Sequence, residues 1–180
     1  MQGMAAEDSS PSLADGKTLS ETAGSEAGIG RTSFAPLFEP GLHRLSEEAL
    51  FERFVKPFSQ QARRIELVAS LELFLNFVRD IGIRCEVWLN GSFTTTKPEP
   101  DDIDLVVLIQ SGQIDALPET RLRKLNDLND RGLLRARYSC DVYVDRMGDA
   151  ERKQYWLEKF GRGRDGSASK GIPVLRIGYD

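Results

Sequence analysis

Three aspartates in this sequence have the spacing and the surroundings to bind a divalent metal ion together. Asp102 and Asp104 stand one residue apart in DDIDLVVLI, and Asp141 lies among apolar residues in SCDVYV. On an extended chain Asp102 and Asp104 point to the same side, about 6–7 Å apart along the strand. Carboxylates that converge repel one another, and Mg²⁺, which prefers oxygen ligands, removes that repulsion. The pattern therefore predicts a magnesium site of Asp102, Asp104 and Asp141.

The same residues leave two alternatives open. Asp145 shares a strand face with Asp141 and could replace it, although the apolar neighbours of Asp141 favour Asp141. Asp102 and Asp104 could also belong to a solvated turn ahead of a strand. Their common face and the apolar run that follows them argue for the metal site.

The residues just before the acidic pair are suited to hold a phosphate group. Gly91 has no Cβ, so backbone amide groups at this point can approach an anion closely. Ser92 adds a hydroxyl donor, and Lys97 in the same loop could meet a phosphate as a point charge, or could be an ordinary surface lysine. A phosphate-binding turn followed by carboxylates is typical of phosphoryl or nucleotidyl transfer assisted by one or two metal ions.

The spacing of apolar residues predicts the elements that position these side chains. Helices are expected to begin at Ser46, Ser59, Pro118 and Asp149. The second of them has apolar residues at three- and four-residue spacing and a stop at Gly82. Strands are expected at RCEVWLN, IDLVVLI, YSCDVYVD and IPVLRIG, and the second of these is apolar enough to be covered on both faces. This order predicts a small mixed β-sheet flanked by helices, with the helices on one side, in an α/β or α+β domain.

The stretch GSFTTTKPEPDDIDLVV resembles the signature of the polymerase-beta-like nucleotidyltransferase superfamily. In that signature Gly-Ser, a spacer and Asp-x-Asp precede a hydrophobic strand, and a third acid, matched here by Asp141, lies on a later strand. The match covers residues 84–145. The compact size is similar to that of the minimal nucleotidyltransferases of bacterial toxin–antitoxin and phage-defence systems.

This resemblance implies a nucleotidyltransferase fold for residues 33–180 and a role for each matched residue. Gly91 and Ser92 would hold the phosphates of the nucleotide. Asp102 and Asp104 would bind two Mg²⁺ ions, and Asp141 would hold the metal on the side of the nucleophile.

The resemblance also implies a reaction and its partners. A hydroxyl group of an RNA, a protein or a small molecule would attack the α-phosphate of a nucleoside triphosphate such as ATP, and pyrophosphate would leave. A cognate toxin or antitoxin would be a further partner. Only about 35 residues follow Asp145, too few for the helical domain of larger relatives, so selection of the base is expected to be weak or to come from the C-terminal loop or a partner.

Composition limits the class of protein further. The chain has 180 residues, of which 40% are hydrophobic and 29% charged, as expected of one globular domain. No apolar run approaches the roughly 18 residues that span a bilayer, and the N-terminus has no signal-peptide pattern, so we expect a cytoplasmic protein that does not contact membranes. Residues 1–32 are poor in apolar side chains and are expected to be disordered. Cys85 and Cys140 fall at apolar strand positions and are expected in the core.

The C-terminal third is basic, with 14 Lys and Arg against 9 Asp and Glu over residues 121–180. In its glycine-rich stretch, Arg162, Arg164 and Lys170 could close over a triphosphate or contact an acceptor, and the stretch could also be a plain flexible loop. We expect a metal-dependent nucleotidyltransferase. The alternatives are a nucleotidyltransferase-fold module that binds a protein or nucleic acid without catalysis, and a phosphohydrolase that uses water as acceptor.

Overall fold

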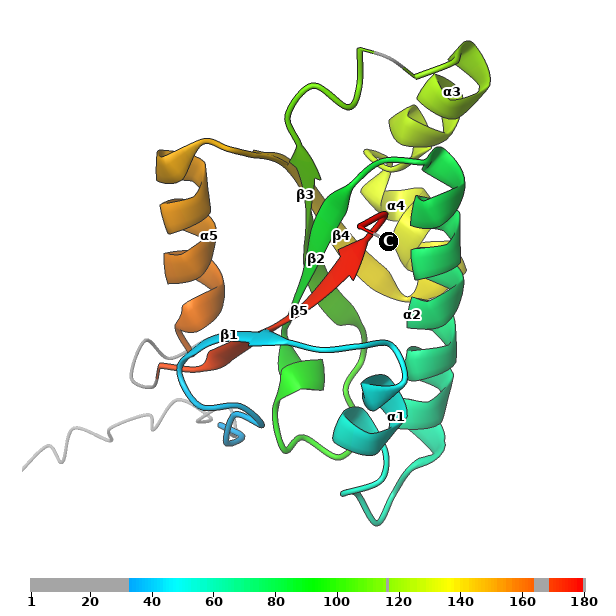
Figure 1. Ribbon diagram of the computed structural model, residues 1–180. Helices are drawn as coiled ribbons and strands as arrows, with labels where there is room; N and C mark the ends of the chain where they lie inside the picture. The colour runs from blue at the N-terminus through cyan, green and yellow to red at the C-terminus, as the bar shows by residue number, and fades with distance from the viewer. Residues whose placement is uncertain (1–32, 116, 164–168, 180) are drawn as a thin grey trace, which may run out of the picture. The chain divides into compact units, whose positions relative to one another are not determined.

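A computed structural model of the chain describes residues 33–115, 117–163 and 169–179, and they form an α+β domain (Figure 1). The sheet in this part of the chain has five strands in the order β1-β5-β2-β3-β4. The strands are β1 Gly41–Arg44, β2 Cys85–Asn90, β3 Ile103–Gln110, β4 Cys140–Met147 and β5 Gly171–Ile177. The central strand β2 is antiparallel to β3 and β5, whereas the outer pairs β3–β4 and β1–β5 are parallel. The sheet is therefore mixed, as the sequence predicted.

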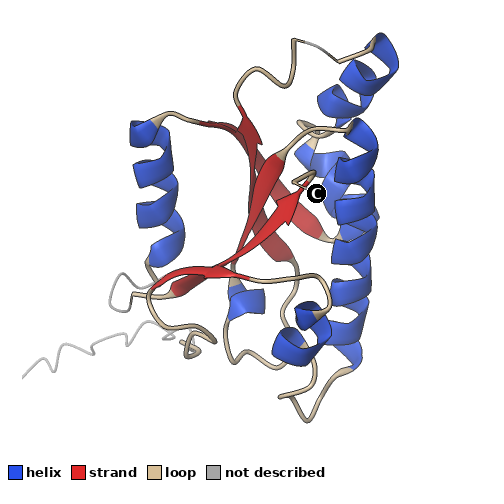
Figure 2. Cartoon of the chain, in the orientation of Figure 1, coloured by secondary structure: helices blue, strands red, loops and turns tan. Residues whose placement is uncertain are grey.

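One face of the sheet is covered by the long helix α2, Ala62–Ile81, together with α4, Arg131–Tyr138 (Figure 2). The buried residues of α2 include Leu67, Leu71, Leu75 and Val78, which recur at three- and four-residue spacing. The helix ends at Gly82, whose left-handed backbone (φ 76°) is the predicted stop. The short helix α1, Ala49–Phe54, packs against α2.

The opposite face is covered by α5, Ala150–Gly161 (Figure 1). A second apolar cluster forms between this helix and the sheet, from Trp88, Val106, Leu108, Trp156, Phe160, Ile172 and Val174. The expectation that all helices lie on one side is therefore wrong. The reason lies in β3, whose apolar side chains point alternately to both faces, so that each face needs a cover.

Two further parts of the chain differ from the sequence-based prediction. The segment after Ser33, where no strand was predicted, forms an antiparallel bridge between Pro36 and Thr95 and then continues into the edge strand β1. The helix expected after Pro118 is two helices, α3 Glu119–Asp127 and α4. The break occurs because the side chain of Asp130 caps α4, accepting a hydrogen bond from the backbone N–H of Leu133 at 2.9 Å.

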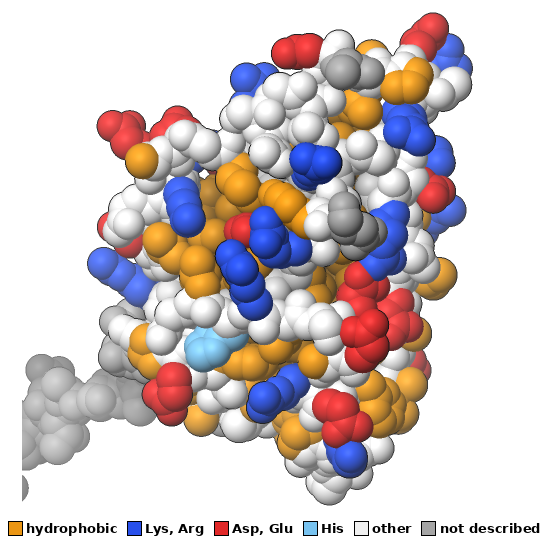
Figure 3. Space-filling view, viewed as in Figure 1, with side chains coloured by type: hydrophobic (Ala, Val, Ile, Leu, Met, Phe, Trp, Pro, Cys, Tyr) orange, Lys and Arg blue, Asp and Glu red, His pale blue; other side chains and the backbone are white. Residues whose placement is uncertain are grey.

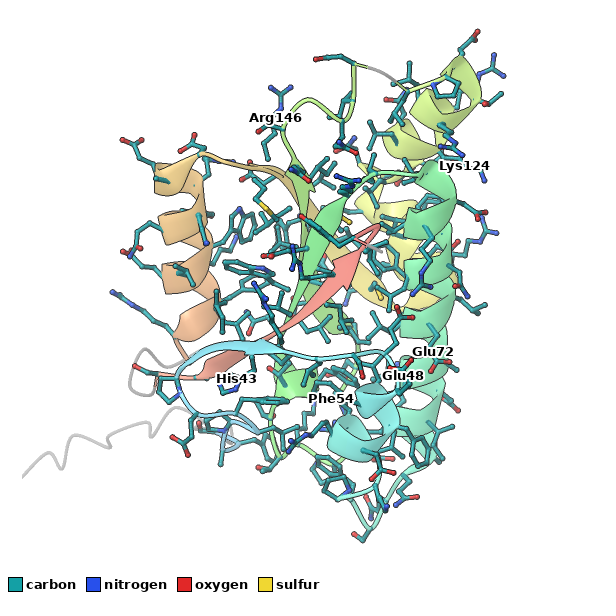
Figure 4. The ribbon with its side chains drawn as sticks, in the orientation of Figure 1. His43, Glu48, Phe54, Glu72, Lys124 and Arg146 are labelled. Carbon is teal, nitrogen blue, oxygen red and sulfur yellow. The ribbon has the colours of Figure 1, made fainter. Side chains whose placement is uncertain are left out.

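Side chains far from the predicted site have structural contacts. Lys124 on α3 pairs with Asp80 on α2 at 3.1 Å, and His43 lies on β1, where its ring is 5.2 Å from that of Phe38 (Figure 4). Cys85 and Cys140 are buried free thiols, as predicted, and burial raises the pKa of each to about 12. None of the described helices is both long and apolar enough to cross a membrane. Residues 1–32, for which the sequence predicts disorder, lie outside the described part of the chain.

Candidate active site

Three polar residues form a row across β2, β3 and β4 on the face covered by α5. Asn90 is the register partner of Asp104, and Asp104 is the register partner of Asp141. Register partners on neighbouring strands are about 5 Å apart and point to the same face. In the next row toward α5 lie Trp88, Val106 and Tyr143, all packed in the second apolar cluster. The sheet therefore brings Asp104 and Asp141 side by side, although 36 residues separate them along the chain.

Gly91 closes one end of this row. Its backbone (φ 77°, ψ −161°) lies in a region that residues with a side chain avoid. A Cβ built on Gly91 would come within 2.0 Å of Oδ2 of Asp104. Gly91 therefore lies directly against the carboxylate of Asp104, and its approach to a phosphate stays a prediction. Ser92 follows directly and begins a short 3-10 helix, Ser92–Thr94.

The loop after Gly91 is held by two neighbouring arginines of α2. Arg64 is fully buried, and its guanidinium lies 3.5 Å from the ring centre of Phe58. It donates hydrogen bonds to the backbone carbonyls of Phe54, Phe93, Thr95 and Lys97, at 2.7–3.1 Å. Burial lowers the pKa of Arg64 to about 10. Arg63 donates to the carbonyls of Pro100 and Asp101, so the loop between Gly91 and Asp102 is attached along its length.

Two of the three predicted carboxylates form ion pairs with α4. Arg131 binds Asp141 with two hydrogen bonds, of 2.9 and 2.7 Å, and Arg135 lies 2.7 Å from Asp102. The bond to Asp141 raises the pKa of Arg131. Within the described residues, no three His, Cys, Asp or Glu side chains stand close enough to hold one metal ion. The convergence of Asp102, Asp104 and Asp141 on one point is therefore not found, and only Asp104 and Asp141 are register neighbours.

The structure separates the roles of Asp141 and Asp145. Asp145 is the register partner of Leu108, four residues along β3 from Asp104. Its Oδ2 accepts hydrogen bonds from Arg152 and from the indole of Trp156, both at 2.8 Å. Burial raises the pKa of Asp145, but these bonds outweigh burial and the pKa is lowered. Asp145 thus attaches α5 to β4, while Asp141 is the carboxylate beside Asp104.

A pocket of about 450 Å³ opens next to the row, between α5 and the sheet. Its lining residues are Asn90, Gly91, Asp104, Tyr155, Glu158, Lys159, Arg162, Gly163 and Lys170. Lys97, the predicted phosphate ligand, does not line this pocket and pairs with Asp101 at 2.7 Å. Of the basic residues predicted in the glycine-rich stretch, Arg162 and Lys170 line the pocket, and Arg164 lies outside the described residues.

Cations surround the aromatic ring next to Asp141. Tyr143 contacts both Arg131, whose guanidinium carbon is 4.4 Å from the ring centre, and Lys159, whose Nζ is 4.3 Å from it.

The space-filling view shows Lys and Arg side chains scattered over one face of the domain, with Asp and Glu side chains between several of them (Figure 3). Lys and Arg side chains therefore form no continuous basic surface on that face.

The donor atoms of the row fit Mg²⁺. Asn90, Asp104 and Asp141 offer only oxygen ligands, which this ion prefers. The Oδ1 of Asn90 is buried and has no hydrogen-bond partner among the described residues, so it remains available to a ligand. Asn90 was missed from the sequence. Its signal was its place as the last residue of a strand, in phase with Trp88 and directly before Gly91.

The two α4 arginines were also missed from the sequence. Arg131 and Arg135 are spaced four residues apart and so lie on one face of a helix. That spacing was readable, but it indicated only an exposed basic face. Their ion pairs with Asp141 and Asp102 depend on where α4 packs against β4.

The fold and this site define an α+β domain that presents carboxylates and a glycine turn at the mouth of a basic-lined pocket. Residues 32–176 match a family of unknown function, DUF6932, and the chain belongs to that family. No curated protein and no solved structure matches the chain.

Proposed function

We propose that this protein is a metal-dependent nucleotidyltransferase that moves a nucleoside monophosphate from a nucleoside triphosphate to a hydroxyl group of an RNA, a protein or a small molecule. One observation carries the proposal: Asp104 and Asp141 are register neighbours, and Gly91 lies directly against the carboxylate of Asp104. This is the arrangement expected if the resemblance of GSFTTTKPEPDDIDLVV extends to the nucleotidyltransferase fold. Such a transfer would suit a toxin–antitoxin or defence system with a cognate protein partner.

In the proposed reaction Asp104 and Asp141, with Asn90, would hold Mg²⁺, and Asp102 would join them once it releases Arg135. Gly91 and Ser92 would contact the phosphates. The metal would supply charge neutralisation for the triphosphate and for the leaving pyrophosphate. The oxygen of the acceptor hydroxyl bonds to the α-phosphorus, and the bond from that phosphorus to the bridging oxygen of pyrophosphate breaks. Asp141, which lies on the side of the row away from Gly91, would take up the proton of the acceptor after it releases Arg131.

A specific observation favours the alternative of a non-catalytic binding module. Asp141 and Asp102 are already neutralised by Arg131 and Arg135. A protein that never binds metal needs such internal partners to keep carboxylates close together. The two functions differ in what happens when metal is offered, because an enzyme must release these ion pairs and a module need not.

The experiment that separates them is a transfer assay. Purified protein is incubated with each α-³²P-labelled nucleoside triphosphate, Mg²⁺ and total cell extract. Label on RNA or protein would establish nucleotidyl transfer and the class of acceptor. Conversion of the triphosphate to free labelled nucleoside mono- or diphosphate, with no labelled RNA, protein or small-molecule product, would indicate a phosphohydrolase. No turnover of any triphosphate, together with no Mg²⁺-dependent nucleotide binding, would overturn the enzyme proposal in favour of the module.

Substitutions of the aspartates test whether the transfer activity depends on this carboxylate site. Asp104→Ala is expected to abolish transfer with the fold retained, because the change removes like-charge repulsion with Asp141. Asp102→Ala is also expected to abolish transfer, but it breaks the partly exposed ion pair with Arg135, so its stability should change little. Asp80→Asn is a matched control, since Asp80 is an exposed carboxylate paired with Lys124 on the α2–α3 side of the domain. Full turnover by Asp104→Ala would show that the metal is not bound at this row.

A further inference from the structure

One basic side chain of the pocket is buried. Lys170 stands directly before β5 and is 8% exposed, whereas Lys159 and Arg162 of the same pocket are exposed. Burial of a lysine is costly unless its ammonium group is paired. Among the contacts of its Nζ are the carbonyl oxygen of Gly91 at 3.3 Å and Oγ1 of Thr94 at 3.4 Å.

Lys170 and Asp104 therefore both contact Gly91. Gly91 meets the carboxylate of Asp104 at its Cα and the ammonium group of Lys170 at its carbonyl. All three line one pocket. A charge in such a buried position interacts more strongly with an anion than an exposed charge does, because the surrounding dielectric constant is lower.

Lys97, the lysine that the sequence favoured, does not line this pocket. The loop sequence favoured Lys97 as a phosphate ligand, but Lys97 pairs with Asp101, and its backbone carbonyl accepts a hydrogen bond from Arg64. Lys97 therefore belongs to the far side of the loop, away from the pocket that Gly91 and Asp104 line.

We propose that Lys170, assisted by Lys159 and Arg162, binds the polyphosphate group of a nucleotide in the pocket between α5 and β5. Lys170 stands before β5 and Arg162 follows the end of α5, whereas Asp141 lies on β4, where Lys159 also reaches the ring of Tyr143. The polyphosphate thus enters from α5, and the edge at β4 and α4 is left for the acceptor. The choice of a nucleotide as ligand rests on the proposed function, whereas the polyphosphate site itself does not require transfer.

The test measures binding, without turnover. The affinities of the full chain for inorganic tripolyphosphate and for ATP, each with Mg²⁺, are measured by calorimetry for wild type, Lys170→Met, Lys170→Arg and Lys97→Met. Lys56→Met is the matched control, since Lys56 is exposed and paired with Glu52 on α1. We expect Lys170→Met to weaken binding of both probes about tenfold or more, Lys170→Arg to restore part of it, and Lys56→Met to change nothing. Thermal unfolding of each variant confirms that it is folded. If Lys170→Met does not fold, the comparison is made with Lys170→Arg.

The outcomes separate this inference from the proposed function. Unchanged binding by Lys170→Met, or a loss confined to Lys97→Met, would overturn the inference even if wild type transfers label. If tripolyphosphate binding depends on Lys170 but the protein transfers no label, the inference is supported and the proposed nucleotidyltransferase function is rejected. No binding of either probe by wild type would overturn the inference.

Discussion

Gly91 and Asp104 are in such close contact that a single methyl group at Gly91 would lie 2.0 Å from Oδ2 of the carboxylate. The contact joins the turn after β2 to the first residues of β3, and these two strands are antiparallel register partners. A phosphate held by the turn and a cation held by the carboxylate would therefore be neighbours. The geometry of the proposed site therefore depends on this contact.

Gly91→Ala tests the contact directly. We expect the substitution to lower the free energy of unfolding by about 1–3 kcal/mol, because the backbone at Gly91 is strained for any residue with a Cβ. We also expect at least a tenfold loss of Mg²⁺-dependent nucleotide binding, since the methyl group displaces Asp104. Gly112→Ala is the control, because Gly112 has the same φ of 77° but open space where its Cβ would be. Equal effects on nucleotide binding in the two variants would show that the displacement of Asp104 does not matter.

Arg131 is expected to compete with a metal ion for Asp141. Arg131→Gln removes both hydrogen bonds to that carboxylate, so Mg²⁺ or Mn²⁺ should bind more tightly. The gain should be about two- to fivefold, because half-exposed ion pairs are weak. The measurement is a metal titration of the protein without nucleotide, beside Arg123→Gln, which breaks an exposed pair with Glu119 on α3. Unchanged or weaker metal binding in Arg131→Gln would argue that Asp141 is not a ligand.

Arg64 is expected to be the main support of the loop after Gly91. Arg64→Met leaves four backbone carbonyls without their donor, and a buried acceptor left unsatisfied costs about 1–3 kcal/mol. We expect the free energy of unfolding to fall by about 3 kcal/mol or more, and the backbone amides of residues 93–97 to exchange hydrogen with solvent faster than in wild type. Arg64→Lys should recover little, because one ammonium group cannot replace the planar guanidinium that contacts Phe58. Equally slow amide exchange of this loop in Arg64→Met would contradict this role.

Asp145 should affect stability in a pH-dependent way. Its pKa is lowered in the folded protein, so the carboxylate stabilises the fold above its ordinary pKa of about 4, and this contribution is lost as the pH falls through the lower folded-state value. Asp145→Asn should therefore be less stable than wild type by about 1 kcal/mol at pH 7, and the difference should shrink below pH 4. Urea unfolding at pH 7 and pH 3 measures it, and Asp80→Asn is the control. A difference that grows in acid would contradict the assignment.

Much of the local structure followed from the sequence, because it depends on neighbours along the chain. The alternation of apolar residues predicted β2, β3, β4 and β5, and the three- and four-residue spacing predicted α2 with its end at Gly82. The face covered by α5 was not predicted. An amphipathic helix shows which of its own faces is buried, and nothing in that pattern says which side of a sheet it will cover.

The candidate site divides in the same way. The sequence by itself determined which residue types stand at strand ends: a glycine-serine turn, two aspartates before an apolar strand and a third aspartate within another. Only the tertiary structure decided that Asp141 and not Asp145 lies beside Asp104, that α4 places arginines on Asp102 and Asp141, and that Lys170 reaches Gly91 across 79 residues of sequence. Strand register and helix packing are set by contacts between distant segments, and these contacts leave no local pattern in the chain.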